Sequence, residues 1–111
     1  MSEALDPKAI ERVVRMGGRE AALEILDRFL SMTERLDGLA ELEPRALEQT
    51  THRITSDAGW LGALKVRESS SLVELLASQG RLEEAAGHFE LLRRLCQEVR
   101  EPLLRQRGSL A

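Results

Sequence analysis

Long apolar runs, cysteine pairs and histidine clusters are all missing from this chain, and each absence excludes a class of protein. No stretch approaches the roughly twenty apolar residues of a transmembrane helix. The first residues, MSEALDPKAIERV, do not have the basic and then apolar layout of a secretory signal. A single cysteine excludes an internal disulfide, and two widely separated histidines provide no ligand spacing for zinc. We therefore expect a cytoplasmic protein with no membrane contact and no metal site.

A basic surface is also missing, which argues against nucleic acid as a partner. The chain has 16 lysines and arginines against 19 acidic residues and a formal net charge of −3, whereas nucleic-acid-binding proteins normally concentrate positive charge. Apolar residues make up 42% of the sequence and charged residues 32%, as in ordinary globular proteins. A length of 111 residues fits one domain, so we interpret residues 1–111 as a single domain.

Apolar residues recur at steps of three and four along the whole chain, and no segment alternates as a strand does. This pattern predicts a short helix that begins at Asp6-Pro7, followed by longer helices over about 19–37, 44–61, 63–78 and from residue 82 onward. Glycines separate these segments at positions 17–18, 38, 62 and 80. Short links favour antiparallel neighbours, so the predicted fold is all-α, an up-down four-helix bundle with a short extra N-terminal helix.

The last predicted helix has nearly heptad-spaced apolar residues from Leu82 to Leu103, which indicates lengthwise packing against a neighbour. Cys96 falls within this series, so we interpret it as a small core residue. Pro102 is expected to kink or end the helix, because an interior proline removes one backbone hydrogen bond and clashes with the preceding turn.

His52 stands in the middle of the helix predicted over 44–61. At about 100° per residue it lies roughly 160° from Ile54 and from the apolar stripe, so it should point to solvent. The residues that share its face are all polar or small: Glu48, Gln49, Thr55, Ser56 and Gly59. A glycine inside a helix costs about 1 kcal/mol relative to alanine. The small residues therefore indicate that the imidazole has been left accessible to a partner.

The stretch HRITSDAGWLG, residues 52–62, resembles the signature of histidine-containing phosphotransfer (HPt) domains. In that family the histidine is followed by a hydrophobic residue at +2, lysine at +3, glycine at +4 and a Leu-Gly pair at +9 and +10. The matching positions are Ile54, Ala58, Gly59, Leu61 and Gly62. The resemblance implies a four-helix bundle in which His52 is the phosphoacceptor. It also implies receiver domains and a histidine kinase as partners, no ATP site and no cofactor, with Mg²⁺ only on the receiver.

Two positions depart from this pattern: Thr55 stands where the family has lysine, and Ser56 where it has glycine. Thr55 can offer one hydrogen bond but no charge to a phosphoryl group, and Glu48 would repel that group. The chain is then either a carrier with a less cationic site or an HPt-like module that binds and modulates a kinase or receiver without being phosphorylated. A helical adaptor in which His52 is incidental is a third possibility.

Two further residues are candidates for the site. Glu74 could accept a hydrogen bond from the Nδ1–H of His52 and leave Nε2 as the nucleophile, although it could also be a solvated glutamate. Trp60 is the only tryptophan, and it could contribute to docking if exposed or cap the core if buried. Missing positive charge could come from Arg53, Lys65 or Arg67. We expect the protein to be a monomer.

Overall fold

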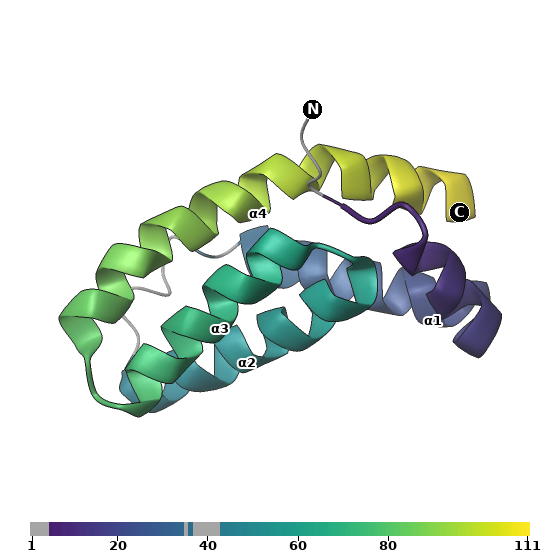
Figure 1. Cartoon of the computed structure of the whole chain (residues 1–111). Helices are drawn as coiled ribbons and strands as arrows, with labels where there is room; N and C mark the ends of the chain where they lie inside the picture. Colours follow the sequence, from purple (N-terminus) through teal and green to yellow (C-terminus); the bar gives the residue numbers. More distant parts are fainter. Residues whose placement is uncertain (1–4, 35, 37–42) are drawn as a thin grey trace.

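The computed structural model describes residues 5–34, 36 and 43–111, and all regular secondary structure in this part of the chain is helical. The helices are α1 (Ala9–Glu34), α2 (Pro44–Leu61), α3 (Leu64–Ser78) and α4 (Leu82–Leu110). Helix α2 packs against α1 and α3, and α4 packs against α3 and α1, so the four helices form a closed ring of neighbours (Figure 1). The predicted all-α four-helix bundle is confirmed. None of these helices, over the part of the chain that the structure describes, is long and apolar enough to span a bilayer.

The predicted short leading helix is present as the first part of α1. Helix α1 is interrupted at Gly18, whose φ of 85° and ψ of 174° lie outside the helical region. This positive φ is accessible to glycine at little cost. At the start of the segment the Asp6 carboxylate accepts a hydrogen bond from the Lys8 amide at 3.0 Å, as expected of a capping residue. That hydrogen bond and the Arg12 guanidinium lower the pKa of Asp6.

One apolar core joins all four helices, and its largest fully buried apolar side chains are Leu26, Phe29, Ile54, Leu61, Leu92 and Leu103. Burial of one such side chain contributes about 1.5–3 kcal/mol. Cys96 is buried as predicted, and desolvation raises the pKa of its thiol to about 12. The prediction for Leu82 is wrong, because this first residue of α4 is exposed and the buried series of that helix begins at Ala85.

Pro102 was expected to kink or end the helix, and of these two alternatives the end is wrong, because α4 runs through Pro102 to Leu110. Because Pro102 has no backbone N–H, it cannot form the usual helical hydrogen bond to the carbonyl of residue 98. Val99 and Leu103, on either side, are buried and hold this stretch against the core. The predicted helix stop at Gly38 lies outside the described residues.

The end of α2 is fixed to the start of the chain by Gly62. This residue has φ 73° and ψ 20°, the left-handed conformation common just past a helix end. A Cβ at position 62 would lie 2.7 Å from the Cβ of Ala9 and 2.9 Å from the Cβ of Asp6. The Gly62 carbonyl accepts a hydrogen bond from the Asp6 amide at 2.9 Å. Both the backbone conformation and the close packing therefore require glycine here.

Candidate functional site

The buried side of α2 decides where His52 points. Its predicted stripe is buried throughout, at Leu47, Thr51, Ile54, Ala58 and Leu61. The side chain of His52, on the opposite face, is 72% exposed. The predicted outward orientation of the imidazole is confirmed.

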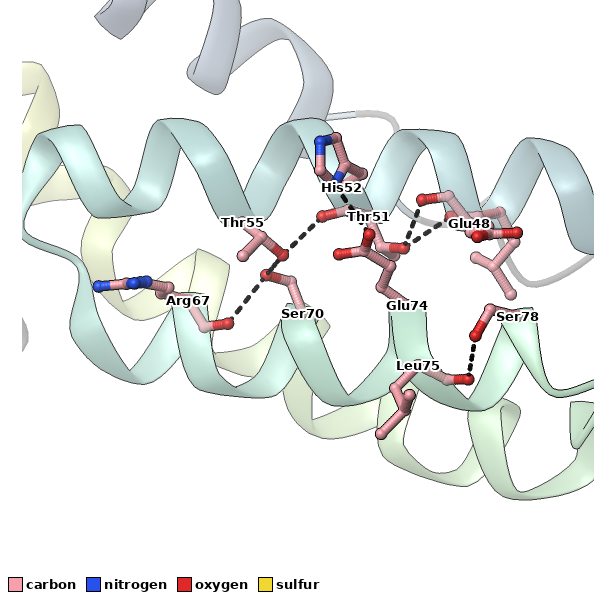
Figure 2. A network of polar contacts seen from close by, with 10 residues as sticks. Glu48, Thr51, His52, Thr55, Arg67, Ser70, Glu74, Leu75 and Ser78 are labelled. Atoms are coloured by element: carbon pink, nitrogen blue, oxygen red, sulfur yellow. Dashed lines mark hydrogen bonds and ion pairs between the residues drawn. The ribbon is translucent and has the colours of Figure 1, made fainter.

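One ring nitrogen of His52 is held by a carboxylate from the neighbouring helix. Nδ1 lies 2.8 Å from Oε2 of Glu74, whose side chain on α3 is 24% exposed (Figure 2). A carboxylate accepts hydrogen bonds, so this contact places the proton of a neutral ring on Nδ1 and leaves the lone pair on Nε2. Figure 2 shows the second ring nitrogen pointing away from α3. The contact anticipated for Glu74 is present, and it presents Nε2 to solvent.

Thr55 lies beside the histidine, but its hydroxyl serves the contact between α2 and α3. The Oγ1 atom donates to the Thr51 carbonyl at 2.8 Å and lies 2.7 Å from the hydroxyl of the buried Ser70 (Figure 2). A threonine has one O–H, and the Thr51 carbonyl and the Ser70 hydroxyl both lie within hydrogen-bond distance of it. The hydrogen bond that the sequence led us to expect from Thr55 toward a phosphoryl group is therefore already in use.

The site-lining residues named from the sequence fall into two depressions around His52. One, of about 330 Å³, is lined by His52, Thr55, Ser56, Gly59, Trp60 and Arg67. The other, of about 650 Å³, is lined by Arg45, Glu48, Gln49, His52, Arg53 and Glu74. The structure therefore brings Thr55, Ser56 and Gly59 together and places Gln49 on the other side of the ring.

Trp60, Gly59 and the candidate cations differ in their surroundings. Trp60 is 47% exposed, so the alternative that it caps the core is wrong. At Gly59 an added Cβ would lie 3.6 Å from Cδ of Arg67, an ordinary contact, so the arginine stem already covers this position. Arg53 and Arg67 both line depressions that include His52, whereas Lys65 lines a groove between α3 and α4.

A third depression, of about 420 Å³, contains residues that the sequence did not single out. Its lining consists of Arg28, Met32, His52, Arg53, Ser56 and Asp57. Asp57 on α2 is only 4% exposed, and its two carboxylate oxygens accept hydrogen bonds from Nε and Nη2 of Arg28 on α1 at 2.9 and 2.7 Å. These hydrogen bonds raise the pKa of Arg28. At 100° per residue Asp57 lies about 60° from Ile54, so periodicity alone could have placed it beside the buried stripe.

Comparison with solved structures gives a structural relative of this chain. The crystal structure of histidine-containing phosphotransfer protein B from Pseudomonas aeruginosa is similar to this chain, with a TM-score of 0.80 and 22% sequence identity over 98% of each chain. No protein-family model matches the sequence, and no curated protein sequence is similar to it. The likeness supports the bundle fold. Within the described residues no three histidine, cysteine or acidic side chains are grouped as metal ligands.

Proposed function

We propose that this protein is a histidine phosphocarrier of a two-component phosphorelay. The observation that carries the proposal is the exposed His52, whose Nδ1 is hydrogen-bonded to Glu74 so that Nε2 is free. Two facts agree with it: the HPt-like signature at residues 52–62 and the fold shared with a histidine-containing phosphotransfer protein. The chain would act as a carrier and not as a free-standing kinase with its own ATP site.

The reaction follows from the state of the imidazole. The Nε2 lone pair attacks the phosphorus of an aspartyl phosphate on a receiver domain, and the P–O bond breaks with its electron pair passing to the aspartate carboxylate. Because Nδ1 keeps its proton, the phosphorylated ring carries a positive charge. The Glu74 carboxylate, 2.8 Å from Nδ1, stabilises that charge. The reverse reaction returns the group to an aspartate of another receiver, and no proton needs to leave the site in either direction.

The proposed partners are a receiver domain and a sensor or hybrid histidine kinase, which would dock on the exposed face of α2. The small side chain of Ser56, one turn after His52, leaves room for the receiver, and the exposed Trp60 offers an aromatic contact near its edge. The receiver would supply Mg²⁺ and most of the charge stabilisation, since phosphoryl transfer depends chiefly on positioning and electrostatics. A monomeric, cytoplasmic protein would suit this role.

Labelling with a phosphorylated receiver tests the proposal. Wild-type protein should acquire acid-labile, alkali-stable phosphate, and His52→Gln should acquire none. His88→Gln is the matched control, because His88 is the other histidine and is exposed on α4. Label that persists in His52→Gln would place the phosphoacceptor elsewhere. Wild type that stays unlabelled with every receiver of the source organism would contradict the carrier role.

A modulator that binds without being phosphorylated is the second candidate. It is favoured by Thr55, whose only O–H is directed at Thr51 and whose position lacks the cation of the HPt pattern. Such a protein would bind a receiver or kinase with unchanged affinity in His52→Gln and would never be labelled.

A further inference from the structure

The three depressions around His52 differ in the charges that line them. The depression on the side of Gln49 is lined by two acids, Glu48 and Glu74, and by two arginines, Arg45 and Arg53. Arg28, Arg53 and the hydroxyl of Ser56 line the depression between α1 and α2, where the only acid in the lining, Asp57, is paired. The depression on the α3 side has Arg67 and no acid among its described lining residues. A phosphoryl group with nearly two negative charges would therefore be attracted to either of these two sides more than to the side of Gln49.

The orientation of the imidazole favours the side of Arg28 over the side of Arg67. Glu74 reaches Nδ1 from α3, and the two nitrogens lie on opposite edges of the ring, so Nε2 points away from α3 (Figure 2). A phosphoryl group on Nε2 consequently projects away from the contact between Thr55 and Ser70 of α3. The depression that includes Arg28 and Ser56 lies on the α1 side of the ring.

Arg28 has the right donors for such a group. A guanidinium has five N–H donors. The Asp57 carboxylate accepts one hydrogen bond from Nε and one from Nη2 of Arg28. Both N–H groups of Nη1 and one N–H of Nη2 are then left for another acceptor. The carboxylate of Asp57 is almost fully buried, so it holds the guanidinium in one orientation while half of the arginine side chain stays exposed. A pre-oriented planar guanidinium suits the oxygens of a phosphate.

We propose that Arg28, oriented by Asp57 and assisted by Arg53, binds the phosphoryl oxygens of phosphorylated His52. The guanidinium reaches the group from α1 and takes the place of the cation that the HPt pattern puts at the position of Thr55. This inference rests on the proposed phosphocarrier function. It makes Arg28 a phosphoryl-binding residue and Asp57 the positioning residue that orients Arg28.

The test is a phosphoryl exchange equilibrium that needs no partner protein. The chain is mixed with N-phosphorylimidazole and imidazole. Nε2 of His52 forms the new P–N bond to N-phosphorylimidazole protonated on its other ring nitrogen, the old P–N bond breaks, and neutral imidazole leaves with the electron pair. Phosphorus NMR measures the ratio of the two phosphorylated species. Arg28→Gln keeps an N–H donor for Asp57 but removes the charge, and it should lower the equilibrium constant about fivefold, the size of one partly exposed charge contact.

Two further variants separate phosphate binding from folding. Arg28→Met combined with Asp57→Leu replaces the ion pair by apolar side chains, which is often neutral for stability, and it should show the same loss. Arg107→Gln is the matched control, since Arg107 pairs with Asp27 and also joins α1 to another helix, but it lines none of the depressions that include His52. It should leave the equilibrium unchanged.

The outcomes are distinct. An unchanged equilibrium in folded Arg28→Gln or in the double variant would overturn the role of Arg28. A loss in Arg67→Met with none in Arg28→Gln would move the cation to the α3 side and overturn it as well. Failure of wild type to accept phosphate from N-phosphorylimidazole, together with no label from any receiver, would overturn the carrier function itself.

Discussion

Two carboxylates contact polar groups across the edges of α2, and they behave in opposite ways. Asp57 is almost fully buried and accepts hydrogen bonds from Nε and Nη2 of Arg28. Glu74 comes from α3, remains partly exposed and makes one hydrogen bond to His52. The Asp57–Arg28 pair joins α1 to α2. The Glu74–His52 pair orients a side chain that is exposed to solvent.

We expect the Asp57–Arg28 pair to hold the helices of the site together and the Glu74–His52 pair to adjust the chemistry of the imidazole. A buried charge that loses its partner cannot be rescued by water, so the Asp57–Arg28 pair should be tied to folding. An exposed carboxylate can be removed and replaced by water, so the Glu74–His52 contact should affect chemistry while stability stays nearly constant.

The largest effect should follow from Arg28→Ala, which leaves the Asp57 carboxylate buried without a charged partner. The free energy of unfolding should fall by about 2 kcal/mol, equivalent to a melting temperature lower by roughly 10 °C for a chain of this size. Thermal unfolding followed by circular dichroism measures both. Arg107→Ala, the control, removes an arginine from a solvent-exposed pair and should lower the melting temperature far less. Equal effects of the two variants would mean that burial of Asp57 does not matter.

A smaller effect, confined to chemistry, is expected for Glu74→Ala. Loss of the acceptor frees the ring to rotate and removes the negative charge that stabilises the phosphorylated imidazole, so phosphoryl acceptance should slow about tenfold, the size of one hydrogen bond to a charged group. The free energy of unfolding should stay within about 0.5 kcal/mol of wild type. Glu74→Gln keeps an acceptor oxygen, so its rate of phosphoryl acceptance should lie between those of Glu74→Ala and wild type. If Glu74→Ala lowered the free energy of unfolding as much as Arg28→Ala, the Glu74–His52 contact would also be needed for folding. The contrast between the two carboxylates would then be wrong.

The smallest effect is expected for Thr55→Lys, which restores the cation of the HPt pattern on the α3 side of His52. The exchange equilibrium should shift toward phosphorylated His52 by no more than about 0.5 kcal/mol, because exposed charge interactions are weak and screened by salt. The equilibrium at low and high salt is the measurement, and Thr55→Gln is the uncharged control of similar length. A gain that persists at high salt would show that this position contributes more than an exposed charge.

Much of the bundle could be predicted because local patterns determine it. The stripe from Leu47 to Leu61 sets the face of α2 that is buried, and the position of His52 follows from it. The break in α1 at Gly18 and the end of α2 at Gly62 were marked by glycine. The helix does not end at Pro102, because the local cost of the proline is outweighed by the burial of Val99 and Leu103.

The rest of the site depends on contacts between distant residues. Asp57 looked like one more polar residue, and its partner is 29 positions earlier in the chain on another helix. The direction of the Thr55 hydroxyl depends likewise on Ser70 of α3. Glu74 could be suggested as a partner of His52, but only the packing of α3 against α2 brings the two side chains within 2.8 Å. Side-chain pairing across helices does not follow from periodicity.

The left-handed turn at Gly62 also affects how short motifs should be used to recognise such proteins. Leu61 fills the core, and Gly62 lets the first turn of α1 pack against the end of α2. Folding alone would therefore require Leu61 and Gly62, even in a related protein that had lost its histidine. A search for functional carriers would discriminate better if it scored a histidine together with an acceptor side chain 22 positions later, the spacing of His52 and Glu74. The Leu-Gly pair reports how α2 ends and packs, whereas the histidine with its acceptor reports on the proposed chemistry.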